Sequence, residues 1–214
     1  MIKVLIADDH ELVRSGIEYI LASDREIEVV GTVASGEEAL EQIASLAPNV
    51  VLMDINMPGM GGLQACHEIK SRHPSVRLLV LSVLNDGPLP RHLLEAGIEG
   101  YLSKHSQPQE MISAIKAVSR GESYLSNDVA CNLALTSGSD RTRSPLDALS
   151  QREMEVTMLT LQGLSIQSIA KILGVSPKTV CTYRYRIFEK LNISNDVELT
   201  RLAAKYGLLN NNDG

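Results

Sequence analysis

The chain has 214 residues, of which 44% are hydrophobic, and a formal net charge of −6. This length suits two domains better than one, and the composition is that of a protein with buried cores. No stretch approaches the roughly 18 to 20 consecutive apolar residues of a membrane span, and the acidic balance argues against a general binder of polyanions.

Short apolar runs alternate with amphipathic segments in the first part of the chain. The runs, which predict buried strands, are 2–7, 27–33, 49–54, 76–82 and 98–103. The segments that follow them, which predict helices, are 11–22, 36–47, 62–73, 88–96 and 108–121. Apolar runs without polar alternation are typical of a parallel sheet buried on both faces. We therefore predict an α/β domain over residues 1–121, with a doubly wound five-stranded parallel sheet.

The polar segment TSGSDRTRSP, residues 136–145, has the composition of a linker and ends in proline. The charge changes sign across it. Residues 1–144 contain 12 Lys and Arg against 19 Asp and Glu, whereas residues 145–209 contain 8 against 6. We therefore expect a linker over 122–146 and a second domain over 147–209.

The second domain is expected to be all-α. Ser150 and Glu153 form a capping-box pattern that predicts a helix through about Leu161. Ser165 is expected to cap a second helix, and Ser176 a third, over residues 177–193. A helix, a short turn and a helix with basic and hydroxyl groups on one side indicate a helix-turn-helix.

Polar side chains lie at the end of, or directly after, four of the five predicted strands. They are Asp8, Asp9, Asp54, Ser82 and Lys104. The carboxyl ends of parallel strands meet at one edge of the sheet, so these groups should converge there. Three carboxylates at close range repel one another unless a cation lies among them, and an oxygen-lined site favours Mg²⁺. The hydroxyl and the ammonium group suit an incoming phosphoryl group.

The motifs ADDH (7–10), MDINMPGMGG (53–62), LS (81–82) and GYLSK (100–104) resemble the receiver domain of two-component response regulators. The resemblance implies that Asp54 is the phosphoacceptor and that Asp8 completes the acidic pocket. It implies a Mg²⁺ site formed by Asp9, Asp54 and the backbone carbonyl of Asn56. Ser82 would then be the switch hydroxyl, Lys104 the phosphate-pairing lysine and Tyr101 the switch aromatic residue.

The loop after Asp54 is expected to be shaped by one proline and three glycines: Pro58, Gly59, Gly61 and Gly62. Glycine permits backbone conformations and close approaches that other residues cannot adopt. The loop can thereby bring the backbone at Asn56 near the metal.

The third helix of the second domain has an inward stripe of Val180, Ile187 and Leu191. Its remaining surface carries hydroxyl, aromatic and basic groups, which favours DNA as the partner. Residues 147–209 closely resemble the LuxR/NarL-type DNA-binding domain. By that resemblance Cys181, Thr182 and Tyr185 face base edges. Lys178, Thr179 and Lys190 lie near phosphates, and Arg184 and Arg186 flank the exposed face.

Both domains together resemble a response regulator of the NarL/FixJ class, most like the GacA/UvrY/LetA group. The resemblance implies a sensor histidine kinase partner of the hybrid type, double-stranded DNA at promoters of small regulatory RNAs, and a homodimer on phosphorylation. We expect no enzyme activity beyond self-catalysed phosphotransfer and autodephosphorylation. The chain starts without a signal region, and its three cysteines show no metal or disulfide spacing, so a cytoplasmic protein without a membrane partner is expected.

Two other classes stay open on the residues alone. A phosphatase that forms an aspartyl-phosphate would need a second acid at position 56, where the chain has Asn56. A ligand-sensing LuxR-type regulator would need an aromatic-lined pocket, but the chain has no tryptophan and one phenylalanine, Phe188.

Overall fold

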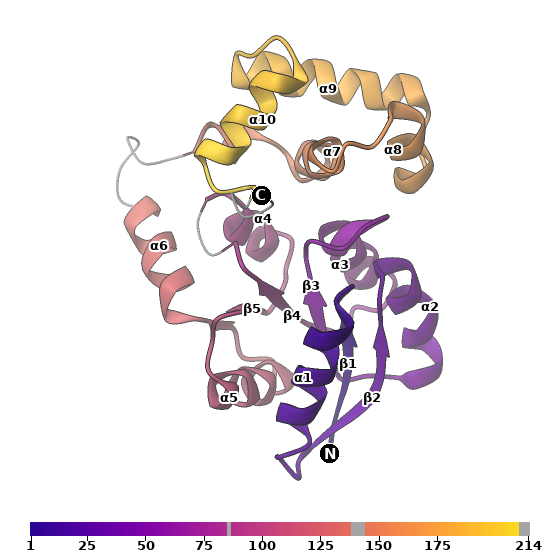
Figure 1. Cartoon of the computed structure of the whole chain (residues 1–214), viewed down its shortest axis with the longest axis vertical. Helices are drawn as coiled ribbons and strands as arrows, with labels where there is room; N and C mark the ends of the chain where they lie inside the picture. Colours follow the sequence, from indigo (N-terminus) through magenta and orange to yellow (C-terminus); the bar gives the residue numbers. More distant parts are fainter. Residues whose placement is uncertain (85–86, 138–143, 210–214) are drawn as a thin grey trace. The chain divides into compact units, whose positions relative to one another are not determined.

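A computed structural model describes residues 1–84, 87–137 and 144–209 of the chain (Figure 1). The described residues form two compact units. The first unit comprises residues 1–83 and 93–130, and the second comprises residues 84–92 and the chain from residue 131.

The first unit is built on a parallel sheet with the strand order β2-β1-β3-β4-β5-β6. The strands are β1 (Ile2–Ala7), β2 (Ile27–Val33), β3 (Val50–Asp54), β4 (Arg77–Ser82), β5 (Gly100–Ser103) and β6 (Tyr124–Leu125). The predicted α/β fold is confirmed, and the five expected strands lie within two residues of their predicted bounds. The sixth strand is a short addition at the edge, where it pairs with β5.

Helices cover both faces of this sheet (Figure 1). They are α1 (Glu11–Leu21), α2 (Gly36–Leu46), α3 (Gly61–Arg72) and α5 (Pro108–Ser119). The helix α4 (Leu89–Glu95), which follows β4, is divided between the two units. On one face, Ile17 and Leu21 of α1 join Ile115 and Val118 of α5 in the hydrophobic core cluster. The opposite face, which carries Leu5, packs against α2 and α3. The apolar residues Met111, Ile112, Ile115 and Val118 of α5 therefore form its core-facing stripe.

The segment predicted as a linker, residues 122–146, is not devoid of regular structure. It contains β6 and the helix α6 (Asn127–Ser137), and a 3₁₀ turn (Pro145–Ala148) begins at its end. Six residues of the polar segment 136–145, residues 138–143, lie outside the described part of the chain.

The second domain is helical, as predicted. Its helices are α7 (Gln151–Leu161), α8 (Ile166–Leu173), α9 (Pro177–Leu191) and α10 (Asp196–Lys205). Ser150 and Glu153 form the expected capping box, and Ser165 and Ser176 cap α8 and α9. The helix α9 ends two residues earlier than predicted, because Asn192 adopts a left-handed conformation with φ of 52° and terminates it.

Along the described chain, no helix combines the length and the apolarity that crossing a bilayer requires.

The strand order determines where a ligand can bind. The connections run in opposite directions from β1 and β3, which are neighbours in the sheet, with Ala7 beside Met53. In open α/β sheets, ligands bind outside the carboxyl ends of the strands at such a switch point. The residues directly after this pair are Asp8 and Asp54.

Candidate functional site

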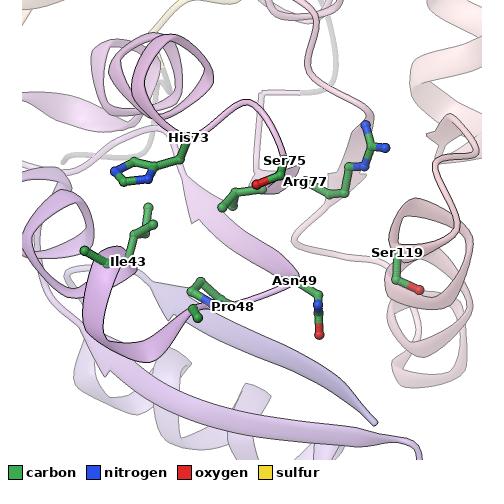
Figure 2. Close-up of a pocket in the computed structure, with 10 residues that line it drawn as sticks. Ile43, Pro48, Asn49, His73, Ser75, Arg77 and Ser119 are labelled. Atoms are coloured by element: carbon green, nitrogen blue, oxygen red, sulfur yellow. The ribbon is translucent and has the colours of Figure 1, made fainter.

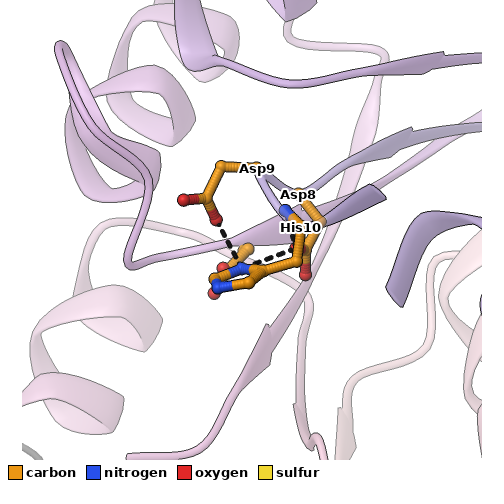
Figure 3. A group of neighbouring side chains, drawn as sticks. Asp8, Asp9 and His10 are labelled. Carbon is orange, nitrogen blue, oxygen red and sulfur yellow. Dashed lines mark hydrogen bonds and ion pairs between the residues drawn. The ribbon is translucent and has the colours of Figure 1, made fainter. Parts of the chain in front are cut away.

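Four side chains meet at the carboxyl ends of β1 and β3. One ligand atom from each of Asp8, Asp9, His10 and Asp54 lies within 4.8 Å of the ligand atoms of the other three. Asp8 and Asp54 are almost fully buried, whereas the His10 side chain is 66% exposed. Figure 3 shows the His10 ring below Asp8 and Asp9. His10 Nδ1 lies 2.8 Å from an Asp9 oxygen and 3.4 Å from an Asp8 oxygen.

Lys104, which follows β5, supplies the positive charge of this cluster. Its Nζ lies 2.7 Å from Asp8 Oδ2 and 2.8 Å from Asp54 Oδ2. The pairing of β4 with β5 places it there, because the Lys104 amide donates a hydrogen bond to the carbonyl of Ser82. Burial acts to lower the pKa of Lys104, but the charges and hydrogen bonds of Asp54 and Asp8 outweigh it and raise the pKa above its ordinary value.

The carboxyl group of Asp54 has a raised pKa. Burial is the main cause, and the charge of Asp8 adds to it. Lys104 and the backbone N–H of Asn56, which donates to Asp54 Oδ1, act in the other direction. The environment therefore disfavours a bare carboxylate at this position, and additional positive charge would stabilise the ionised form.

The donor set fits a hard divalent cation. When ionised, the three carboxylates and the single ammonium group give the pocket a formal charge of −2. A Mg²⁺ ion would neutralise that charge, and carboxylate oxygens are its preferred protein ligands. The pocket thus has the composition expected of a magnesium site.

Ser82 and Tyr101 lie beside this cluster on β4 and β5. Both side chains are fully buried. Burial raises the pKa of the Tyr101 phenol well above its usual range, and the hydrogen bond to Ser82 offsets part of that rise. The two residues that the sequence singled out as switch groups are thus directly connected.

The loop after Asp54 is held in place by its glycines. Gly59 and Gly61 have φ angles of 77° and 70°, a region that side chains other than glycine rarely adopt. A Cβ atom on Gly62 would lie 1.9 Å from the carbonyl oxygen of Asp54. The first turn of α3 therefore rests directly on the backbone of Asp54, and Asn56 lies exposed in the loop between them.

A cavity of about 500 Å³ opens at the other end of the same sheet (Figure 2). It lies among the starts of β3 and β4 and the ends of α2, α3 and α5, and its described lining contains no carboxylate. The labelled residues include Asn49, His73, Arg77 and Ser119. This cavity is therefore separate from the acidic cluster, and its described lining offers no carboxylate that could accept a phosphoryl group or bind a metal ion.

In the second domain, the candidate DNA-facing residues lie on α9. Lys178, Cys181, Thr182, Tyr185 and Arg186 are exposed, and Tyr185 is 69% exposed despite its aromatic ring. The inward residues Val180, Ile187 and Leu191 are buried, as predicted. The surface expected to meet DNA is therefore open to solvent, and Thr179 lies half-buried at its edge.

Two cations of α9 are held within the domain. Arg184 contacts both carboxylate oxygens of Asp196 at 2.7 Å and lies over the Phe188 ring. Lys190 lies 2.6 Å from Glu153 Oε2 and donates to the carbonyl of Ala148. By contrast, Lys178 and Arg186 form no ion pair with any described residue.

Sequence reasoning assigned no role to His10, although the motif ADDH contains it, and did not foresee the ion pairs of Arg184 and Lys190. The adjacency of His10 to Asp8 and Asp9 was the available signal. The partners of Arg184 and Lys190 lie 12 and 37 positions away, so no local pattern marks them.

These features combine an acidic pocket at the carboxyl edge of a parallel sheet with a helical domain that carries an exposed basic helix, and the comparison with known families agrees. Residues 4–116 match the response regulator receiver domain, and residues 147–203 match the bacterial regulatory proteins of the luxR family. The chain belongs to the response regulators that carry a LuxR-type DNA-binding domain.

Its relatives are similar over nearly their whole length. The chain is 46% identical to the response regulator UvrY of Escherichia coli over 98% of this chain and 97% of the relative. It is 44% identical to the response regulator GacA of Pseudomonas aeruginosa over 98% of both. Among solved structures, RcsB of Salmonella enterica serovar Typhimurium, bound to promoter P1flhDC with the phosphomimetic BeF₃⁻, is 28% identical, with a TM-score of 0.78. That match covers 95% of this chain and 98% of RcsB.

Proposed function

We propose that Asp54 accepts a phosphoryl group from a sensor histidine kinase and that this modification controls DNA binding by α9. The observation that carries the proposal is the pocket itself, in which Lys104 lies within 2.8 Å of both Asp8 and Asp54 at the carboxyl edge of a rigid sheet. A buried carboxylate with a fixed direction is suited to in-line attack on phosphorus.

In the transfer, an oxygen of Asp54 forms the new bond to phosphorus. The bond between phosphorus and the histidine nitrogen of the kinase breaks, and its electron pair stays on that nitrogen. Asp9, Asp54 and the backbone carbonyl of Asn56 would hold a Mg²⁺ ion, which neutralises charge on the transferring group. Lys104 and Ser82 would then bind phosphoryl oxygens. Autodephosphorylation is the corresponding attack by water, which returns the Asp54 carboxylate.

The phosphoryl group would act through residues that already contact each other. The backbone N–H of Lys104 donates a hydrogen bond to the Ser82 carbonyl, and the Tyr101 side chain is hydrogen-bonded to the Ser82 side chain. A phosphoryl group that binds Ser82 and Lys104 would therefore change the contacts between the end of β4 and the end of β5. A phosphoryl group that is bound better in one of two receiver conformations shifts the equilibrium toward that conformation. The size of the shift equals the difference between its interaction free energies in the two conformations.

For DNA, the open residues of α9 are the proposed contacts. Cys181, Thr182 and Tyr185 would face base edges, and Lys178, Thr179 and Arg186 would lie near the phosphates. Arg184 and Lys190 belong to the same surface, but Asp196 and Glu153 hold their charges. We therefore propose that these two residues position α9 and contribute to the positive field.

The resemblance to UvrY and GacA extends the proposal to a hybrid-type kinase, promoters of small regulatory RNAs and a homodimer on phosphorylation. RcsB, which is 28% identical, has been solved as two dimers bound to two parallel DNAs. Helix-turn-helix proteins pair on half-sites about one helical turn apart, which favours the dimer. A footprint of the phosphorylated protein on genomic DNA would identify the promoters.

The assignment of Asp54 is tested by incubating the protein with acetyl phosphate and Mg²⁺. The wild type should carry one phosphoryl group at Asp54, and Asp54→Asn should carry none, because the amide lacks the nucleophilic oxygen. The circular dichroism spectrum of the variant should match the wild type. Steady release of phosphate at a high rate would indicate a phosphatase instead, and full labelling of Asp54→Asn would rule out Asp54 as the acceptor.

A further inference from the structure

One side chain in the acidic pocket has no role in the proposed phosphoryl transfer. His10 lies at the N-cap position of α1, but its side chain makes no capping hydrogen bond. Its backbone N–H donates to Asp8 Oδ1 at 2.9 Å, which directs the residue back over the pocket. The ring therefore belongs to the carboxylate cluster and not to the helix terminus (Figure 3).

The distances place the imidazole nitrogen within reach of an ion that the carboxylates hold. The ligand atoms of His10, Asp8, Asp9 and Asp54 lie within 4.8 Å of one another. Metal–nitrogen and metal–oxygen bonds of first-row ions are about 2.0 to 2.2 Å long. Ligand atoms around one ion are thus separated by at most about 4.4 Å, so small adjustments bring His10 Nδ1 onto a cation that Asp9 and Asp54 hold.

The chemistry of the fourth donor differs from that of the other three. Carboxylate oxygens suit Mg²⁺ and Mn²⁺ alike, whereas imidazole nitrogen favours transition metals and contributes little to Mg²⁺. A pocket of carboxylates alone would discriminate weakly between these two ions. An imidazole nitrogen at the exposed side of the pocket raises the affinity for Mn²⁺ but not that for Mg²⁺.

We propose that His10 Nδ1 coordinates Mn²⁺ directly when that ion occupies the pocket, and that this ligand makes the receiver selective for Mn²⁺ over Mg²⁺. The proposal rests on the proposed function for the presence of a metal site, but it concerns which ion binds there. His10 is a specificity-determining residue in this view, and Mg²⁺ still supports phosphorylation.

The exposure of His10 makes it suitable for substitution. Its side chain is 66% exposed and Asp8 and Asp54 keep their contacts with Lys104, so His10→Gln should fold. His105 provides a matched control, because it is exposed, follows Lys104 directly and lies outside the ligand group. His105→Gln makes the same chemical change without removing a donor.

The first experiment is isothermal titration calorimetry of the full chain with MnCl₂ and with MgCl₂ at one pH. Loss of a partner of a metal ligand already costs about 10–100-fold in affinity. His10→Gln should therefore weaken Mn²⁺ binding by at least about tenfold and leave Mg²⁺ binding within about twofold. His105→Gln should bind both ions like the wild type. Equal loss for the two ions, or no loss, would overturn the proposal.

The second experiment has a decisive result in the wild type alone, with His10→Gln as its control. Electron spin echo envelope modulation of the Mn²⁺-bound wild type should show coupling to a directly bound ¹⁴N nucleus, and His10→Gln should lack it. Absence of the ¹⁴N coupling in the wild type would show that His10 is not a ligand. Labelling of wild-type Asp54 in Mg²⁺ separates the two proposals, because it tests the phosphoacceptor whatever His10 does.

Discussion

At the scale of single residues, Lys104 occupies the position between two carboxylates that a metal ion would otherwise neutralise. Its ammonium group lies between Asp8 and Asp54, which would otherwise repel each other. A metal ion and a phosphoryl group would both have to compete with these contacts. The contacts of Lys104 should therefore change when a metal ion or a phosphoryl group binds.

Lys104→Ala should therefore separate phosphorylation from its consequence. We expect Asp54 to accept phosphate, but the phosphorylated variant should gain little DNA affinity. The substitution also removes the repulsion between the ammonium group and the metal ion, which is roughly 4 kcal/mol for unit charges 4 Å apart at an effective dielectric constant of 20. We expect about 1.4 kcal/mol of this repulsion to appear in the binding free energy, so Mg²⁺ should bind about tenfold more tightly. Gel shift assays and calorimetry measure the two effects. If the phosphorylated variant binds DNA like the wild type, Lys104 has no coupling role.

At the scale of elements, the junction of β3 and α3 depends on the absence of one side chain. The start of α3 lies so close to β3 that a Cβ on Gly62 would meet Asp54 O at 1.9 Å. Because the neighbouring atom is backbone, it cannot rotate away. The position of the phosphoacceptor and the position of the helix are thus coupled.

Gly62→Ala should impair both stability and chemistry. Overpacking costs about 1–3 kcal/mol, and a displacement of about 1 Å at a reacting group can slow a reaction about 100-fold. Gly16 provides the control, since it lies within α1 and a Cβ at this position would have nothing within 4 Å, so Gly16→Ala should stabilise by about 0.5–1 kcal/mol. Urea unfolding and the initial rate of labelling by acetyl phosphate report these effects. Unchanged labelling in Gly62→Ala would contradict the coupling.

Glu99 connects three elements at the other end of the sheet. Its carboxylate contacts Lys70 of α3 and Arg77 of β4 and accepts the N–H of Leu78. Burial acts to raise the pKa of Glu99, but the hydrogen bonds from Leu78, Lys70 and Arg77 lower it below its ordinary value. The ionised carboxylate is therefore the form that stabilises the fold.

Glu99→Gln should lower the free energy of unfolding by about 1.5–3 kcal/mol at neutral pH, the contribution of hydrogen bonds to a charged group. A depressed carboxyl pKa contributes stability above the unfolded value of about 4.3, and that stability is lost as pH falls through the folded pKa. The difference between variant and wild type should thus shrink in denaturant titrations below about pH 4. A difference that stays constant with pH would exclude a role for the charge.

The sequence was informative wherever topology alone places residues together. Asp8, Asp54, Ser82 and Lys104 meet because parallel strands end at a common edge, which needs no knowledge of side-chain contacts. Strand β6 was missed because two residues are too few for a periodic pattern. The pairing of Lys190 with Glu153 depends on the packing of α9 against α7, which periodicity does not report.

At the scale of the whole molecule, the acidic chain presents a local surface for a polyanion. The net charge is −6, yet Lys178 and Arg186 on α9 have no acidic partner among the described residues. Local charge, and not the average, determines an encounter within about 10 Å at 0.1 M salt. DNA affinity should thus depend strongly on a few residues.

Three substitutions distinguish the roles of these residues in salt-dependent binding assays. Lys178→Ala should weaken binding to all sequences and reduce the salt slope by about 1, because one phosphate contact is lost. Tyr185→Ala should relax base preference.

Lys190→Ala should mainly lower the stability of the free domain, by about 1–3 kcal/mol, because it leaves Glu153 buried without its cation. An unchanged melting temperature for Lys190→Ala would contradict its positioning role.

The short strand β6 has a consequence for where the first folding unit ends. Its backbone covers the outer side of β5, since Tyr124 donates to the Glu99 carbonyl and Ser126 to the Tyr101 carbonyl. A fragment that stopped at residue 121 would leave this side of β5 as an open edge, and open edges associate with strands of other molecules. A fragment that continued to residue 130 would keep β6 and the fully buried Val129. A receiver fragment cut at residue 121 is therefore expected to self-associate more readily than one that ends at residue 130, because the residues after α5 cover the edge of β5.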